Sequence, residues 1–313
     1  DGDDLWRIIP FDMNLSWGAA FMDLAAFDGI QVTNDNLKSF PLYGSSKAIP
    51  DGMSNWNRIY DVIFSVPQTR EMFLRRMRTL LDTYVKPPGT PANQLVLEPL
   101  ALAWRDLIGD EAELDRNTWG WPAKGGQCNF DPGIRVTNGV NILINEFIAK
   151  RRGHFYGKHS VTNVALPVGI NKTDNAGIPL AQPTNAIVSI LSWDYNPASG
   201  NQDHEYICLT NANAFAVDVS GWLLSGGATH RLQAGTVIPA FGALYLTPNI
   251  VAFRTRTNAP RSGMGLFVQG NYKGHLNAWG ESLSLTDNHG RLVSTNGYLG
   301  APSAAQRYLR ITE

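Results

Sequence analysis

The sequence predicts an α+β protein in which a mainly helical part is followed by an all-β sandwich. Apolar residues recur at helical spacings of three and four through much of the first 160 residues. From about residue 186 onward, short apolar runs alternate with Gly, Asn, Pro and Ser, which is typical of short strands joined by turns. We therefore expect a first domain over 1–160, a connector over 161–185, a sandwich over 186–300 and a tail over 301–313.

Composition narrows the possible partners. The 313 residues include 43% hydrophobic and 17% charged side chains, enough for substantial cores, and the formal net charge is −1. A chain without basic excess is a poor partner for nucleic acid. The Arg75, Arg76 and Arg78 group and the 150–152 group are interpreted as solvated helix faces and ends. No run approaches the roughly 18 apolar residues of a membrane span.

The first strand is expected over 5–11, directly followed by polar residues. Asp12, Asn14 and the turn residue Gly18 come next, and carboxylate and amide oxygens are ligands for a hard cation such as Mg²⁺. Asp12 and Asn14 are therefore the candidate metal ligands. Because only four residues precede this strand, we expect the chain to begin inside a domain.

Four helical segments are predicted to follow. They cover 54–64, a stretch from Pro67 that ends at Pro87, 92–108 with an acidic extension over 110–115, and 139–152. In the second, Arg70, Arg75 and Arg78 are expected to turn outward; in the third, Leu100 and Trp104 are expected to be buried. The apolar stripe expected on the second helix consists of Met72, Phe73, Met77, Leu80, Leu81 and Tyr84.

The connector over 161–185 is rich in Pro, Gly, Asn and Thr and suits an extended surface segment, with the domain boundary near residue 180. The short strands beyond it fit an immunoglobulin-like sandwich, and the apolar residues on either side of the turn at 218–221 favour this arrangement. The expected strands are 186–193, 205–209, 216–219, 222–225, 229–232, 243–246, 265–267, 282–285 and 292–294.

Several other residues are candidates for sites, and each has a simpler structural explanation. Asp23 and Asp28 are predicted to be exposed loop acids, and His154 and His159 surface or boundary histidines. Glu205 resembles a polar strand entry. The two cysteines, Cys128 and Cys208, are predicted to be buried or half-buried thiols, with an interdomain disulfide as the alternative.

Aromatic residues of the second half offer a possible platform for glycan or protein contact. Most of them are expected in the core, because sandwich interiors use such side chains heavily. The residues in question are Trp193, Trp222, Trp279, Tyr206 and Tyr272.

Both halves resemble known families. IPFDMNLSWG, followed by NWNRIYDVIFSVPQTREMFLRRMRTLLDTYV, resembles the C-terminal part of a CotH-type atypical protein kinase domain. EYICLTNANAFAVDVSGWLLSGGATHRLQAGTVIPAFGALYL resembles a lamin-tail domain of immunoglobulin-like fold. The first resemblance implies that Asp12 holds Mg²⁺ against the phosphates of ATP. Asn14 stands where that family usually has a second Asp, and its amide brings no charge to the metal.

Two functions follow from these resemblances. The first is a fragment or processed part of an extracellular or cell-envelope CotH-like kinase, inactive alone because the phosphate-covering and catalytic-loop portions have no counterpart upstream of Asp12. An N-terminal fragment of the same precursor would then be its partner. The alternative is a non-catalytic surface or assembly protein, in which the kinase-like scaffold and the lamin-tail-like sandwich bind a protein or surface partner.

Overall fold

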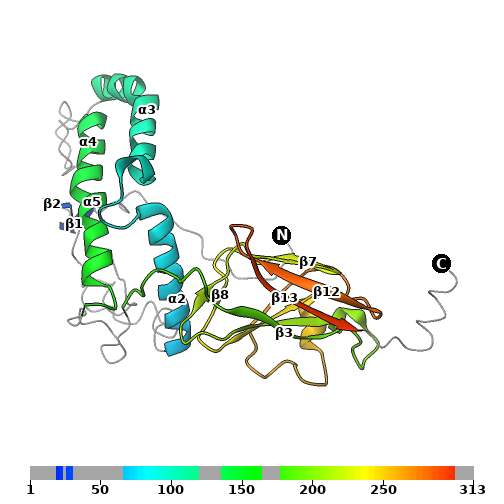
Figure 1. Cartoon of the computed structure of the whole chain (residues 1–313). Coiled ribbons are helices and arrows are strands. Elements are labelled where there is room, and N and C mark those ends of the chain that lie inside the picture. Colours follow the sequence, from blue (N-terminus) through cyan, green and yellow to red (C-terminus); the bar gives the residue numbers. More distant parts are fainter. Residues whose placement is uncertain (1–18, 24–25, 31–65, 120–134, 164–176, 300–313) are drawn as a thin grey trace. The chain divides into compact units, whose positions relative to one another are not determined.

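The computed structural model divides the chain into two compact units (Figure 1). The sandwich unit combines Val66–Thr79 with Pro179–Glu313, and the helical unit contains the rest. The strand predicted over 5–11 and the helix predicted over 54–64 lie outside the described residues. The structure describes residues 19–23, 26–30, 66–119, 135–163 and 177–299.

A β-hairpin opens the described part of the helical unit. Strand β1 (Ala19–Asp23) pairs antiparallel with β2 (Ala26–Ile30), and Asp23 lies opposite Ala26. The prediction that Asp23 and Asp28 belong to loops is wrong, because both lie in strands. The neighbouring aromatic and β-branched residues favour this extended conformation.

Two long helices make up most of the remaining described residues of this unit. After a short turn, η3 (Ala92–Gln94), helix α3 spans Leu97–Trp119. It includes the acidic segment 110–115 that was predicted as an extension of this helix. The second helix is continuous from Val136 to Lys158. Its segments follow one another without a gap, and the residues at each junction have right-handed helical φ and ψ values. Its segments are α4 (Val136–Ile142), η5 (Leu143–Ile148), α5 (Ala149–Gly153) and η6 (His154–Lys158), of which the two η segments are π-helical.

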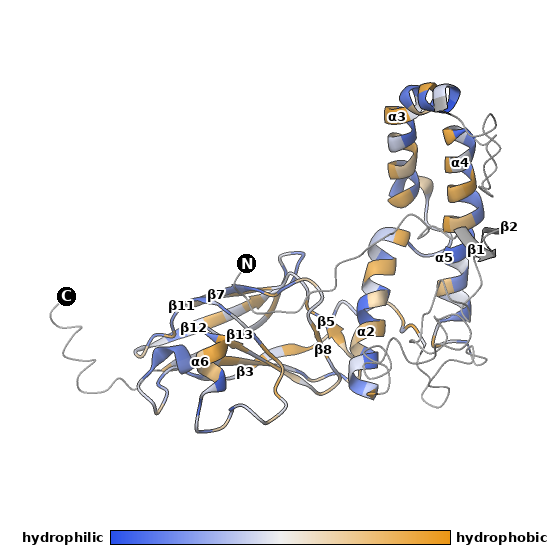
Figure 2. Ribbon diagram, turned by 180° about the vertical axis from the view of Figure 1, so that it is seen from behind, coloured by the Kyte–Doolittle hydropathy of each residue, from blue (hydrophilic) through white to orange (hydrophobic). Residues whose placement is uncertain are grey.

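Several large apolar side chains of α3 are exposed. The predicted burial of Leu100 and Trp104 is wrong, since their side chains are 51% and 57% exposed. Helix α3 packs along α4 and η5, and Figure 2 shows hydrophobic stretches along both α3 and α4. A 23-residue helix with apolar residues around most of its circumference cannot bury all of them against one neighbour.

Helix α2 (Pro67–Leu80) starts at the predicted proline and continues as the π-helical turn η2 (Leu81–Val85). Lys86, with a φ of 65°, ends it before Pro87. The predicted orientation is wrong: Arg70 and Arg75 are each 4% exposed, whereas Phe73 is 38% exposed. Leu80 and Tyr84 from the predicted apolar stripe are exposed as well.

The surface that α2 meets explains why its arginines are buried. Glu71 accepts a hydrogen bond from the backbone N–H of Ala216 (2.7 Å), and Arg75 Nε donates to the carbonyl of the same residue (2.9 Å). A second Arg75 nitrogen donates to the carbonyl of Leu180 at 2.8 Å. The helix thus satisfies both backbone groups of one residue with side chains one turn apart.

Further contacts of α2 involve the connector and the turn that follows β5 (Val217–Asp218). Arg76 forms an ion pair with the buried Asp218 at 3.1 Å, and Arg78 donates to the carbonyl of Pro179 at 2.9 Å. Gln182 bonds both the N–H and the C=O of Asp218. Both views place α2 beside β5 and its partner β8 (Val237–Ile238) (Figures 1 and 2).

The connector is not simply an extended surface segment. Ile178 is 1% exposed and donates its N–H to the carbonyl of His159 at 2.7 Å, and its carbonyl accepts from Val161 at 3.0 Å. The surface prediction for 161–185 is therefore wrong at Ile178, where the chain is buried and paired.

The second half is a β-sandwich, as predicted. One sheet has the order β10-β9-β4-β3, the other β11-β7-β6-β12-β13, and β5 pairs with β8. The remaining elements are β3 (Val188–Asp194), η7 (Gln202–His204), β4 (Tyr206–Asn211), β6 (Leu223–Ser225), β7 (Ala228–Arg231), β9 (Ala243–Thr247), α6 (Ile250–Arg254), β10 (Val268–Gly270), β11 (Lys273–Gly274), β12 (Gly280–Thr286) and β13 (Leu292–Leu299).

Alternation along the strands builds the core. Ile207 and Leu209 on β4, like Leu283 and Leu285 on β12, lie two residues apart and are fully buried. The strand predicted over 265–267 is displaced to β10, which runs parallel to β9 after a connection that contains α6. Strands β8 and β11, each two residues long, were not predicted.

Asn211, at the end of β4, joins several segments of the sandwich. Its side chain is buried, and its amide nitrogen donates to the carbonyls of Phe215 (2.9 Å), Ile238 (3.0 Å) and Pro239 (2.9 Å). Its amide oxygen accepts from the backbone N–H of Asn213 at 2.9 Å. This one amide therefore bonds three backbone carbonyls, of which that of Pro239 also accepts from the Gly242 N–H at 2.9 Å.

Candidate functional site

The metal site predicted from the sequence lies outside the described residues. Neither Asp12 nor Asn14 falls within them, so the Mg²⁺ site stays a prediction. In the described part of the chain, no group of three or more His, Cys, Asp or Glu side chains is placed to hold a metal ion. No helix in that part is long and apolar enough to cross a membrane.

The histidine pair is buried. His154 and His159 are 7% and 0% exposed, so the prediction of surface histidines is wrong. Their Nε2 atoms lie 3.1 Å apart, which requires one ring to donate and the other to accept. Ile178 covers this end of the helix through its hydrogen bond to the His159 carbonyl.

The cysteine prediction is confirmed where it is testable. Cys208 is a free thiol on β4, 2% exposed, and burial raises its pKa, so it stays protonated at neutral pH. Cys128 lies outside the described residues.

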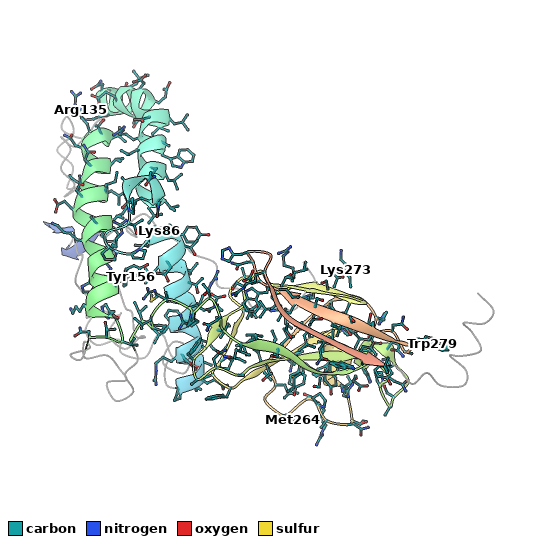
Figure 3. The ribbon with its side chains drawn as sticks, viewed as in Figure 1. Lys86, Arg135, Tyr156, Met264, Lys273 and Trp279 are labelled. Carbon is teal, nitrogen blue, oxygen red and sulfur yellow. The ribbon has the colours of Figure 1, made fainter. Side chains whose placement is uncertain are left out.

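The aromatic residues of the sandwich divide as expected between core and surface. Trp222 and Tyr272 are each 4% exposed and belong to the core, and Trp193 packs against it. Trp279 is 39% exposed and lies just before β12, where Figure 3 labels it at the end of the sandwich unit. Trp193 and Tyr206 are half-buried, so Trp279 is the most exposed member of this set.

Further aromatic rings gather where β3 and β13 run side by side. Tyr298 stacks on Tyr195 with ring centroids 4.8 Å apart and contacts Trp193 at 5.2 Å. Ser294 and Asn296 of β13 bond the backbone of Ile190 on β3 at 3.2 and 3.0 Å, which ties the two sheets together along this side.

A shallow hollow of about 440 Å³ opens beside these rings. We call it the aromatic hollow. Its walls combine an indole, a phenol, a carboxylate and exposed backbone, which together offer both apolar and hydrogen-bonding surface. The lining residues are Trp279, Gly280, Glu281, Ser282, Gly297, Tyr298 and Leu299.

Hydrogen bonds fix the polar groups of the aromatic hollow. The Tyr298 hydroxyl lies 2.9 Å from the Asn277 carbonyl and 3.0 Å from Glu281 Oε1, which also accepts from the Asn277 N–H at 3.0 Å. Burial, followed by the interaction with Glu281, raises the pKa of Tyr298, so its phenol stays protonated. Glu281 keeps a second oxygen for which no hydrogen bond is recorded within the described residues.

A buried carboxylate lies elsewhere in the sandwich. Glu205 directly precedes β4, at the strand entry that the sequence predicted, and it is fully buried. Its Oε2 accepts from the Tyr272 hydroxyl (3.1 Å) and the Leu276 N–H (3.0 Å), and His275 Nδ1 is 3.4 Å away. Within the described residues, Oε1 has no partner. Desolvation outweighs these donors and raises the pKa of Glu205.

This raised pKa predicts a pH-dependent stability that Glu205→Gln should remove. A carboxyl group whose folded-state pKa exceeds its unfolded value stabilises the fold below the unfolded pKa, and this contribution is lost as pH rises through the folded pKa. Relative to wild type, the variant should therefore gain stability as the pH rises from about 4 towards neutral, because wild-type Glu205 loses its favourable protonated state in this direction. Urea unfolding across this pH range measures it; an unchanged difference between the two proteins would contradict the assignment.

Comparison with known proteins gives no family for this chain. No protein-family model matches it, and no curated protein matches it significantly. The site must therefore be judged from its geometry.

Proposed function

We propose that the sandwich unit, with its docked helix α2, is a non-catalytic, lamin-tail-like binding module of an extracellular or cell-envelope protein. The aromatic hollow is its binding site, and its ligand is a sugar ring of a surface polymer. The observation that carries this proposal is the joint exposure of the Trp279 ring and fixed polar groups on one open surface.

The chemistry of the aromatic hollow supports a saccharide. A sugar ring presents an apolar face of C–H groups, which packs against an indole, and hydroxyl groups around its rim, which need donors and acceptors. Glu281 and Ser282 supply such groups next to Trp279. Because the hollow is shallow and open, we expect dissociation constants in the micromolar to millimolar range.

Titration of the full chain with soluble N-acetylglucosamine and glucose oligomers tests this proposal. We expect binding by at least one oligomer, measured by isothermal titration calorimetry, and a loss of about tenfold or more in affinity in Trp279→Ala, because the stacking surface is removed. Trp104→Ala is the matched control, since Trp104 is 57% exposed on α3 of the other unit. Equal affinities of wild type and Trp279→Ala would contradict the proposal.

A CotH-like kinase is the second candidate for the parent protein. The IPFDMNLSWG motif favours it, and the helix that the resemblance places after this motif corresponds in part to α2. Asp12 and Asn14 would hold Mg²⁺ and ATP, and an N-terminal fragment of the same precursor would supply the missing portions. Mg²⁺-dependent ATP binding by the intact precursor, lost in Asp12→Ala, tests this candidate; a precursor that binds no ATP rules it out.

A further inference from the structure

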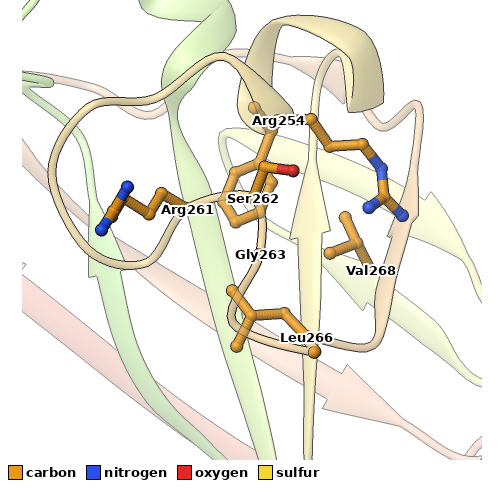
Figure 4. A pocket seen from close by; sticks show the side chains of 8 residues that line it. Arg254, Arg261, Ser262, Gly263, Leu266 and Val268 are labelled. Carbon is orange, nitrogen blue, oxygen red and sulfur yellow. The ribbon is translucent and has the colours of Figure 1, made fainter.

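A second hollow lies where α6 and the loop before β10 meet (Figure 4). We call it the α6 hollow, and its volume is about 240 Å³. Its apolar surface comes from Phe253, Leu266 and Val268, whereas Arg254, Arg261 and Ser262 add polar groups. Figure 4 shows the two guanidinium groups on opposite sides of the hollow. It shares no lining residue with the aromatic hollow.

The two arginines of the α6 hollow are not engaged in the fold. Among the described residues, neither Arg254 nor Arg261 has an ion pair or a side-chain hydrogen bond, and both are exposed. Their neighbour Arg256 behaves differently. It pairs with Asp194 at 2.9 Å, donates to the Pro260 carbonyl at 2.9 Å and is almost buried. Arg256 therefore holds the loop in place, and the other two remain available for a ligand.

All formally charged residues in the sequence around the α6 hollow are basic. No Asp or Glu occurs between residues 219 and 280, while five Arg or Lys residues do, so this segment carries a formal charge of +5 in a chain of net charge −1. The α6 hollow lies within this segment. Because acidic neighbours along the chain do not neutralise the two arginines, the local potential favours an anion. The five residues are Arg231, Arg254, Arg256, Arg261 and Lys273.

Two glycines lie in the loop that follows Arg261. Gly263 and Gly265 have φ values of 82° and 65°, in the left-handed region that favours glycine. A Cβ on either glycine would meet no atom within 4 Å, so this part of the hollow is open to a ligand. The main chain can thus approach a bound group without steric hindrance from side chains.

We propose that the α6 hollow binds a small organic anion in which a phosphate, sulfate or carboxylate is joined to an apolar body. Because the two guanidinium groups lie on opposite sides of the hollow, one of them would form paired hydrogen bonds with the anionic group, and the other would add to the favourable potential. The apolar body would cover Phe253 and Leu266. This site goes beyond the saccharide site of the proposed function and does not depend on it.

Binding of phenyl phosphate to the full chain tests this inference, with benzyl alcohol as the uncharged probe. We expect phenyl phosphate to bind at least about tenfold more tightly than benzyl alcohol, and to weaken as salt is added. The affinities for benzoate and phenyl sulfate, compared with that for phenyl phosphate, show which anionic group the hollow prefers. Inorganic phosphate alone should bind more weakly than phenyl phosphate, because it leaves the apolar surface uncovered.

The double variant R254A/R261A should lose about tenfold or more in affinity for phenyl phosphate. Its matched control is R231A/K273A, which removes the same charge from the same basic segment outside the hollow and should bind within about twofold of wild type. Trp279→Ala should leave the binding of phenyl phosphate unchanged. Failure of the saccharide proposal can therefore be distinguished from failure of the anion site. Equal losses in both double variants, or equal binding of phenyl phosphate and benzyl alcohol, would overturn the inference.

Discussion

Replacing Asn211 by Asp should destabilise the sandwich unit more than any other substitution considered for this protein. The change exchanges an NH₂ group for an oxygen at nearly constant volume, so packing is preserved. Three backbone carbonyls would lose the hydrogen bond from Asn211 Nδ2 and face a buried negative charge, although Pro239 keeps its bond from the Gly242 N–H. We expect the free energy of unfolding to fall by ~4 kcal/mol or more, because an unpaired buried charge adds to the unsatisfied carbonyls.

Urea unfolding tests this prediction, and hydrogen exchange in peptides that cover β4 and β9 monitors the transition. Asn249→Asp is the matched control. Asn249 precedes α6, and its side-chain oxygen accepts from the Ala252 N–H at 3.0 Å, a role that a carboxylate fills equally well. This variant should stay within ~0.5 kcal/mol of wild type. A similar effect of both substitutions would contradict the role of the Asn211 amide in joining these segments of the sandwich.

Arg75→Ala should have the second largest effect. The guanidinium donates to the carbonyls of Ala216 and Leu180, and it lies 5.9 Å from the ring of Phe215. Because Arg75 is 4% exposed, its removal leaves two acceptors with no replacement side chain and opens a gap under α2. We expect the free energy of unfolding of the sandwich unit to fall by ~3 kcal/mol.

Arg105→Ala provides the comparison for this prediction. Arg105 lies on α3 and pairs with Asp106, whose side chain is 66% exposed. Surface ion pairs contribute little, so a change below ~0.5 kcal/mol is expected. Urea unfolding of both variants, monitored through β4, measures the difference. A loss below ~1 kcal/mol in Arg75→Ala would contradict the described docking of α2.

The sequence predicted the sandwich because the period of two is a local property. Ile207 and Leu209 alternate with polar or smaller residues, and the same pattern recurs on β12, so strands and their inward faces could be read directly. Strand β10 was misplaced because its residues Val268, Gln269 and Gly270 carry no apolar alternation. Its position follows from parallel pairing with β9, which is a tertiary property.

The orientation of α2 could not be predicted by the same reasoning. Apolar periodicity assumes that a helix buries its apolar face, which here would place Phe73 inward and Arg75 outward. The surface that α2 meets presents backbone N–H and C=O groups, so Glu71 and Arg75 are the side chains that satisfy it. Only the tertiary structure reveals that requirement.

The candidate sites were predictable to different degrees. Trp279 was recognised as a possible surface aromatic, but its exposure depends on the position of β12 and β13. The α6 hollow was missed, although the stretch without Asp or Glu between 219 and 280 was a readable signal for Arg254 and Arg261. Glu205 gave no signal, because burial of a single carboxylate depends on contacts from Tyr272 and Leu276 far along the chain.

The central claim is that α2 and the β-sandwich form one folded module. Native-state hydrogen exchange of the full chain at increasing urea concentration tests it most directly. Amides of α2 should open in the same cooperative transition as those of β4 and β9, and Arg75→Ala should shift that transition as a whole. Exchange of α2 together with α3 and the 136–158 helix, while β4 and β9 stay protected, would contradict the claim.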